Sequence, residues 1–74
     1  MDRTTIEPAI RAILGEINSK LTEAARIAKA ADACAAAGSI TEGVSVSMDI
    51  EQLLYKAGRL QDAASLLNRL SKEN

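Results

Sequence analysis

The chain offers few side chains that could carry out chemistry. It contains no histidine, which is the commonest general base, a frequent metal ligand and the usual activator of a catalytic serine or cysteine. The single cysteine, Cys34, lies in an alanine-rich stretch near Lys29 and Asp32, which favours a small, partly buried residue over a reactive thiolate; a disulfide between two copies is the alternative. The sequence therefore predicts no catalytic residue, no cofactor and no metal site, and a protein that is not an enzyme.

The charged residues and glycines likewise predict no catalytic or ligand-binding site. Asp49 and Glu51 fall at an expected helix start, where negative charge complements the helix dipole. Gly38 and Gly43 lack the Lys-Ser/Thr sequence that completes a phosphate-binding loop. Nine basic and ten acidic residues leave a formal charge of −1, and both signs are scattered along the chain. This balance gives no electrostatic footprint for nucleic acid or for an anionic membrane.

The 74 residues are enough for one small domain, residues 1–74, near the size at which a single core becomes marginal. Hydrophobic residues make up 47% of the chain, but many are alanine and Tyr55 is the only aromatic residue. No apolar run is long enough to span a membrane, and the N-terminus lacks the layout of a signal peptide. With a single cysteine, these features favour a soluble cytoplasmic protein that gains stability by self-association.

The first predicted helix covers about residues 8–37. Thr4 or Thr5 is the expected cap, Pro8 is acceptable in the first turn, and Gly38 ends the helix in a left-handed conformation. Three pairs of opposite charge are expected on its outer side: Glu7–Arg11, Glu16–Lys20 and Glu23–Arg26. Its apolar residues recur at spacings of three and four, which predicts a stripe that another helix covers: Ile10, Leu14, Ile17, Leu21, Ala24, Ala28, Ala31 and Ala35.

A connection over residues 38–48 follows. Val44, Val46 and Met48 alternate with Ser45 and Ser47, a pattern typical of a strand. Two interpretations stay open for this segment: a loop that folds over the end of the hairpin, or a short strand that pairs with another chain. Asp49 is the expected cap of the next helix, with Gln52 completing an approximate capping box, and Ser47 is the competing cap.

The second predicted helix covers about residues 49–72. Its apolar stripe contains Ile50, Leu53, Ala57, Leu60, Ala64 and Leu67, and it is widened by Leu54, Ala63, Leu66 and Leu70. Because a stripe this wide needs more than one neighbour, we expect two copies of the hairpin to form a four-helix bundle.

Residues 54–64 resemble the turn of a tetratricopeptide repeat, with Gly58 late in the first helix and Ala63 early in the second. Residues 37–43, about twenty residues earlier, have a similar layout. Together the two segments cover about a quarter of the chain, and three stacked repeats are normally needed for stability. The resemblance implies a break at Gly58 and peptide binding. A helix-turn-helix with its turn at Gly58 is another interpretation, although the reading helix would carry only Arg69 as a cation. The alternative to both is a continuous helix through Gly58.

Together these patterns predict an all-α fold: a two-helix antiparallel hairpin that pairs into a homodimeric four-helix bundle. The expected function is a structural or protein–protein interaction module that acts through apolar helix faces. A small dimeric nucleic-acid-associated regulator is the alternative. Self-association is assigned to Ile10, Leu14, Ile17, Leu21, Ile50, Leu53, Leu60 and Leu67, and contact with another protein to Leu54, Tyr55, Leu66 and Leu70.

Overall fold

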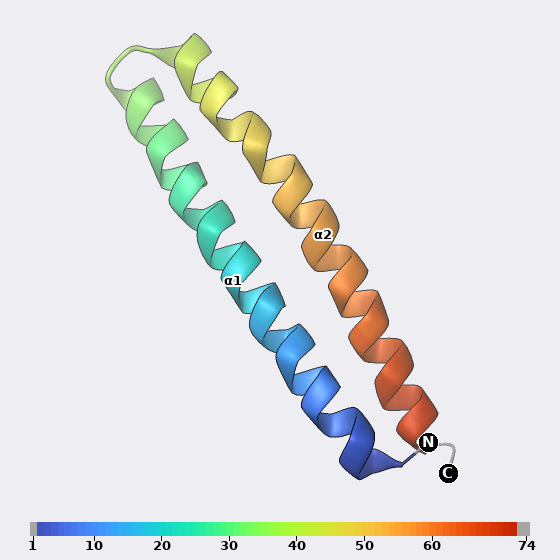
Figure 1. The fold of residues 1–74 in the computed structure, drawn as a ribbon. Helices are drawn as coiled ribbons and strands as arrows, with labels where there is room; N and C mark the ends of the chain where they lie inside the picture. The colour runs from blue at the N-terminus through green and yellow to red at the C-terminus, as the bar shows by residue number, and fades with distance from the viewer. Residues whose placement is uncertain (1, 73–74) are drawn as a thin grey trace.

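The computed structural model describes residues 2–72 and contains two long α-helices, α1 (Arg3–Ala36) and α2 (Ile40–Lys72). They run antiparallel and pack along their whole lengths, so that the turn lies at one end of a narrow rod and both chain termini lie at the other (Figure 1). The Cα atoms extend over 57 × 14 × 11 Å. The predicted all-α antiparallel hairpin is confirmed.

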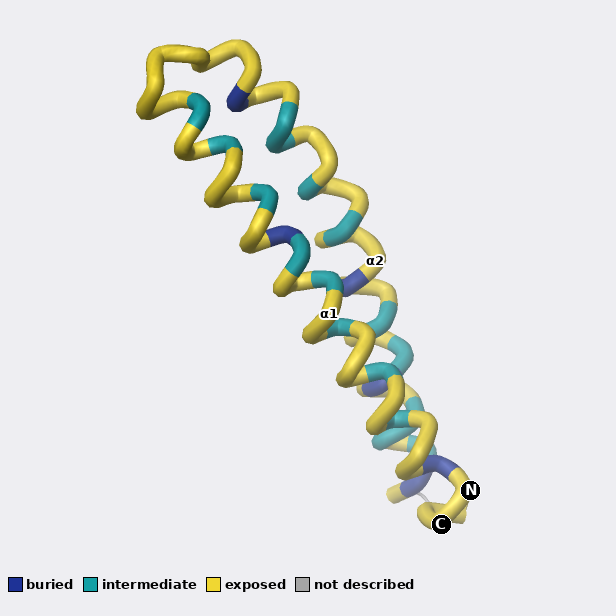
Figure 2. The backbone as a smooth tube through the Cα atoms, turned by 60° about the vertical axis from the view of Figure 1, so that its left-hand side comes forward, coloured by how far each residue is buried: buried dark blue, intermediate teal, exposed yellow. Residues whose placement is uncertain are grey.

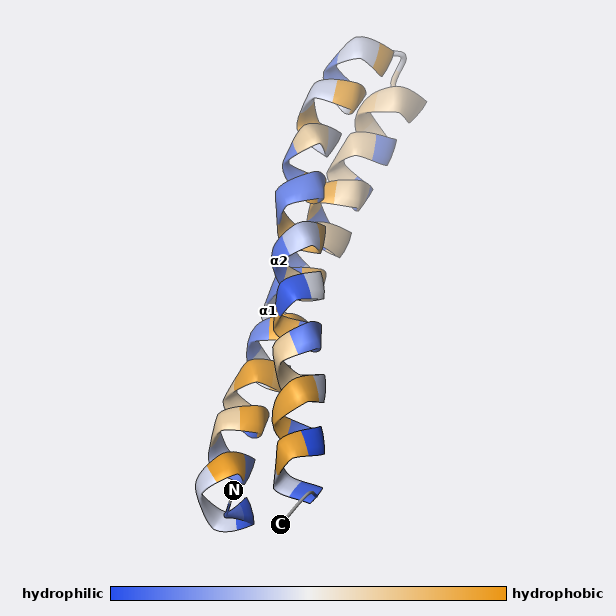
Figure 3. Ribbon diagram, turned by 90° about the vertical axis from the view of Figure 1, so that its right-hand side faces the viewer, coloured by the Kyte–Doolittle hydropathy of each residue, from blue (hydrophilic) through white to orange (hydrophobic). Residues whose placement is uncertain are grey.

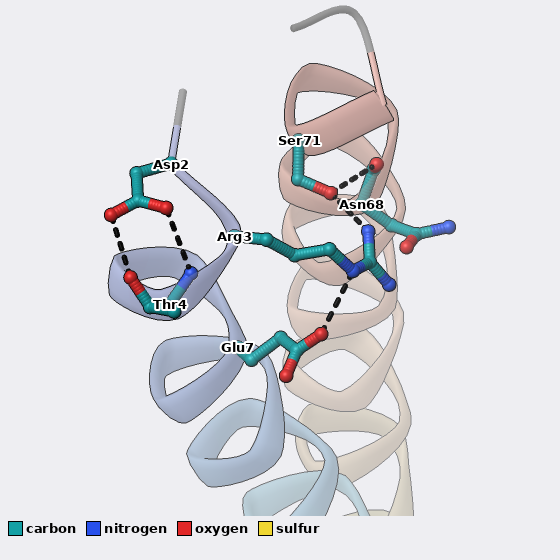
Figure 4. Close-up of polar contacts among 6 residues, drawn as sticks. All are labelled: Asp2, Arg3, Thr4, Glu7, Asn68 and Ser71. Carbon is teal, nitrogen blue, oxygen red and sulfur yellow. Dashed lines mark hydrogen bonds and ion pairs between the residues drawn. The ribbon is translucent and has the colours of Figure 1, made fainter.

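α1 begins earlier than residue 8 because Asp2, rather than Thr4 or Thr5, caps it. The Asp2 carboxylate accepts hydrogen bonds from the Thr4 backbone N–H at 3.2 Å and from the Thr4 hydroxyl at 2.6 Å (Figure 4). These bonds lower the pKa of Asp2, because they favour its charged form. The first turn is also fixed by tertiary contact, since Ile6 is only 3% exposed. Pro8 therefore lies inside the helix rather than at its start.

Arg3 ties the first turn of α1 to the last turn of α2. Its guanidinium donates to the hydroxyl of Ser71, which in turn donates to the backbone carbonyl of Asn68 at 3.0 Å. The same guanidinium pairs with Glu7 at 2.8 Å, so Glu7 does not form the expected pair with Arg11. The expected pairs Glu16–Lys20 and Glu23–Arg26 are confirmed.

The turn between the helices is short and hydrogen-bonded. Gly38 has φ +94°, which confirms the predicted left-handed helix end. The N–H of Gly38 donates to Ala35 O at 3.0 Å, and that of Ser39 donates to Cys34 O at 2.9 Å. This pair of bonds is a Schellman motif, which satisfies the last carbonyls of a helix. The next turn is already α2, since the N–H of Gly43 donates to Ser39 O at 3.0 Å.

The predicted connection over residues 38–48 is therefore wrong. Val44–Met48 is neither loop nor strand but part of α2, and Asp49 lies inside that helix rather than at its cap. The alternating apolar residues do not share one face of this helix. Val46 and Ser47 are half-buried towards α1, whereas Val44 and Met48 are exposed.

α2 is also continuous through Gly58. The break implied by the resemblance to tetratricopeptide repeats does not occur, and the helix-turn-helix interpretation lacks its turn. Ala57 and Ala64, which lie on either side of Gly58 in the sequence, are buried where α2 packs on α1.

Gly43 is a point of close approach between the helices. A Cβ atom at this position would lie 2.8 Å from the carbonyl oxygen of Ala31 and 3.6 Å from the Cβ of Cys34. The backbone oxygen cannot move away without disturbing α1, so the contact requires glycine.

From this contact, the buried and half-buried residues that face the other helix recur at spacings of three and four along both helices (Figure 2). In the resulting antiparallel register the residue numbers of each facing pair add to 77. Most pairs combine a large and a small residue, which brings two helices close together. Extended along both helices, this register assigns nine facing pairs: Ile6 with Ser71, Ile10 with Leu67, Ile13 with Ala64, Ile17 with Leu60, Lys20 with Ala57, Ala24 with Leu53, Ile27 with Ile50, Ala31 with Val46, and Cys34 with Gly43.

Replacing Gly43 tests this close approach. We expect Gly43→Ala to lower the free energy of unfolding by about 1–3 kcal/mol, because the added methyl group forces the helices apart. Gly15→Ala is the matched control: nothing lies within 4 Å of a Cβ there, so alanine should stabilise the helix by up to about 1 kcal/mol. Urea unfolding followed by circular dichroism measures both. Equal stabilisation by the two substitutions would contradict the contact.

The cap at Asp2 predicts a pH dependence. Because the pKa of Asp2 is lowered in the folded state, its contribution to stability is present above the unfolded-state pKa and is lost as the pH falls through the lowered folded-state pKa. Asn also caps helices but does not titrate in this range. The advantage of the wild type over Asp2→Asn in thermal melts should therefore shrink from pH 6 to pH 2. A constant difference would mean that the carboxylate charge does not contribute.

Candidate interaction surface

The structure separates the eight residues that the sequence assigns to self-association. Six of them lie along the line where α1 and α2 face each other, and all six are half-buried: Ile10, Ile17, Ile50, Leu53, Leu60 and Leu67. The other two, Leu14 and Leu21, remain 54% and 44% exposed. Within one chain, the six half-buried residues already pack against the other helix, whereas Leu14 and Leu21 do not.

The side of α1 that meets α2 is rotated relative to the predicted stripe. The predicted Leu14, Leu21, Ala28 and Ala35 are exposed, and their places at the contact are taken by Ile6, Ile13, Ile27 and Cys34. The apolar stripe of α1 is thus wider than α2 can cover. The missed residues are separated by multiples of seven, but so are Leu14, Leu21, Ala28 and Ala35, so spacing alone does not distinguish the two sets.

The exposed part of this stripe continues onto α2. Leu14, Leu21, Ala28 and Ala35 each directly follow a residue at the helix contact, and Leu54 does the same on α2. Ile40 lies fourteen residues before Leu54 on the same line, which also contains polar residues: Glu7, Ser47, Gln61 and Asn68. In an antiparallel pair, residues in this position on both helices lie on the same broad side. We call this surface the apolar flank, and it consists of Leu14, Leu21, Ala28, Ala35, Ile40 and Leu54, all exposed. Leu54 is 51% exposed.

Side-chain size along the apolar flank changes from one end of the hairpin to the other. On α1 it falls from Leu14 and Leu21 to Ala28 and Ala35 towards the turn. Figure 3 shows the same trend in hydropathy, with the strongest hydrophobic colour of α1 in the half near the termini and a paler, alanine-rich half near the turn.

The opposite broad side is charged. It carries Glu16, Glu23, Asp49 and Lys56. Arg26 pairs with Glu23, which lowers the pKa of the Glu23 carboxyl and raises that of the Arg26 guanidinium. An open depression on this side is lined by Glu16, Lys20, Lys56, Arg59 and Leu60. The hairpin therefore has one broad side rich in charged residues and an opposite side rich in exposed apolar residues.

Within residues 2–72, Lys20 is the one charged residue on the line of contact between the helices. It faces the small Ala57, its side chain is 24% exposed, and its Nζ reaches Glu16 Oε1 at 3.0 Å. The aliphatic stem therefore crosses the contact while the ammonium group stays at the charged flank.

The four residues that the sequence assigns to another partner are not brought together. Leu54 belongs to the apolar flank, and Leu70 is half-buried on the other side of α2. Tyr55 and Leu66 lie on the outer edge of α2, with the guanidinium of Arg59 over the Tyr55 ring at 5.7 Å from its centroid. A shallow depression beside Tyr55 is lined by Met48, Glu51 and Gln52. These positions do not form one continuous surface.

Among residues 2–72, no three His, Cys, Asp or Glu side chains are grouped so that they could hold a metal ion. Cys34 is a free, half-buried thiol against Gly43. Neither of the two helices in this range is long and apolar enough to cross a membrane. Compared with models of known protein families, with curated proteins and with solved structures, the chain gives no match.

Replacing Lys20 tests whether its ammonium group contributes to the stability of the hairpin. We expect Lys20→Met to raise the free energy of unfolding by up to about 1 kcal/mol, because the apolar stem is kept and the exposed pair with Glu16 contributes little. Lys29→Met, at an exposed position of the same helix, is the matched control and should change stability by less. Urea unfolding measures both variants. Marked destabilisation by Lys20→Met alone would show that the ammonium group is needed.

Proposed function

We propose that the chain is a structural, protein–protein interaction module that acts as a homodimeric four-helix bundle, with the apolar flank as the contact between copies. The observation that carries this proposal is the exposure of Leu14, Leu21 and Leu54 on one side of the hairpin. A helix with apolar residues both on the line that faces its partner and on one adjoining side is typical of a bundle, where a further helix covers that side, rather than of an isolated pair.

The hairpin alone is poorly able to shield its apolar residues. Within residues 2–72 no large side chain is completely shielded from water, and only Ile6 and three alanines form the hydrophobic part of the buried set. Small single cores of this kind are usually reinforced by association. A second copy on the apolar flank would supply the missing neighbour without any change in the fold.

The free energy that burial of the apolar flank can supply, and the area of that side, are comparable with those of a dimer interface. Complete burial of a Leu or Ile contributes about 1.5–3 kcal/mol, so each half-exposed side chain has roughly 1 kcal/mol left to gain. Leu14, Leu21, Leu54 and Ile40 in two copies thus supply about 8 kcal/mol, within the estimated 4–15 kcal/mol cost of association. A side of 57 × 14 Å covers about 800 Å², the area per partner of a standard stable interface.

The nucleic-acid-associated alternative rests on a helix-turn-helix at Gly58, which the continuous α2 does not provide. We therefore propose the interaction module alone, without enzymatic activity.

The proposal is tested by the molar mass of the chain in solution. Light scattering and sedimentation across about 1–500 μM, with a reducing agent present, should give twice the chain mass of 7.8 kDa at the upper concentrations. The melting temperature should rise with protein concentration, because association stabilises only the folded chain. A helical monomer at every concentration would contradict the proposal.

Substitutions on the apolar flank locate the contact. We expect Leu14→Gln with Leu21→Gln to shift the chain to monomer. Leu66→Gln is the matched control, because Leu66 is 46% exposed but lies on the outer edge of α2, and it should leave the dimer intact. Equal loss of dimer in both variants would place the contact elsewhere.

A further inference from the structure

We infer that the apolar flank takes a second copy in the antiparallel orientation, so that the turn of one hairpin lies at the terminal end of the other. This inference rests on the proposed dimer and adds its geometry. It is drawn from two independent features of the described residues: the gradient of side-chain size along the apolar flank, and the separation of charge along the rod.

The first feature is the order of large and small side chains. Leu14 lies seven residues before Leu21, and Ala28 lies seven residues after it. A two-fold axis across the rod at Leu21 places Leu14 of one copy against Ala28 of the other, a large residue opposite a small one. The parallel orientation would place the two Leu14 side chains at one level of the rod and the two Ala28 side chains at another, which crowds one half of the contact and leaves space in the other.

The second feature is the charge of the two ends. Residues 2–20 and 57–72 form the terminal half of the rod and carry six basic and four acidic side chains. With Glu73, which follows them in the sequence, the count is six basic and five acidic, a net charge of +1. Residues 21–56 form the half near the turn, with three basic and five acidic side chains, a net charge of −2. An antiparallel pair places halves of opposite sign together, whereas a parallel pair places like charges together.

Arg11 and Asp32 make this argument specific. They lie ten residues before and eleven residues after Leu21, both exposed and on the side of α1 that borders the apolar flank. Among residues 2–72, neither side chain takes part in an ion pair within the chain. Across the same two-fold axis, each Arg11 would lie near Asp32 of the other copy, and the contact occurs twice.

The orientation is measured as a distance between spin labels near the turn. Cys34→Ala removes the native thiol, and Ala37→Cys introduces one at the exposed helix end. At 1.5 Å per residue, the antiparallel dimer places the two labels about 50 Å apart. The parallel dimer places them within about 30 Å, since packed helices lie only 8–10 Å apart.

The outcomes separate the inference from the proposal on which it rests. A distance near 50 Å supports the antiparallel orientation. A dimer with labels within about 30 Å overturns the inference and leaves the dimer itself intact. A monomer, recognised by the absence of any dipolar coupling and by its mass, overturns both.

Charge exchange is an independent test that leaves the apolar flank unchanged. At low salt, Arg11→Glu and Asp32→Arg should each raise the dimer dissociation constant about three- to tenfold, and the double variant should restore it. Both single effects should weaken at 1 M salt, because exposed charges are screened. In a parallel dimer, Arg11 of one copy and Asp32 of the other lie at different levels of the rod and do not meet. Single changes without effect, or a double variant that fails to recover, would therefore overturn the inference.

Discussion

A helix in a two-membered hairpin has only one neighbour, and this constraint governs the whole molecule. α1 and α2 can each shield a line of residues, but the remaining sides face water whatever their composition. The chain meets this limit with small residues on the facing lines, which let the helices approach closely. The buried set accordingly contains three alanines and a glycine, and the large side chains are mostly half-buried or exposed. The small residues on the facing lines thus set the distance between the helices, and the half-buried Ile and Leu residues lie beside them.

Three local devices hold the helices in one register. The Arg3–Ser71 contact fixes the terminal end, the Schellman turn at Gly38 fixes the other end, and Gly43 sets the spacing beside it. Lys20 adds a polar group in the middle of the contact, where its ammonium must reach the charged flank. A slip by one turn would bury that charge or separate these contacts. The register is thus set by a few residues distributed over the length of the rod.

Much of the fold follows from the sequence, and the parts that do not have identifiable causes. The spacing of Ile10, Ile17 and Ala24 indicates a covered helix, and Gly38 marks its end. The choice between Leu14 and Ile13 cannot be made from spacing, because both continue a pattern of threes and fours; only the position of α2 decides it. Gly43 is unfavourable in a helix by propensity, so its place in α2 depends on the close approach of Ala31. The apolar flank depends on the same choice and could not be identified before the helices were paired.

The short turn also determines the order in which the hairpin can assemble. Facing pairs near it, such as Cys34 with Gly43, are separated by few residues, whereas pairs near the termini, such as Ile6 with Ser71, enclose nearly the whole chain. Because loop closure costs more entropy as the enclosed segment lengthens, contact formation proceeds most readily outwards from the turn. The alanine-rich half of α1 favours this order, since alanine has the highest helix propensity. The larger side chains near the termini therefore pack last during folding, and in the reverse order they separate first on unfolding. Their contacts include that of Ile6, the buried isoleucine.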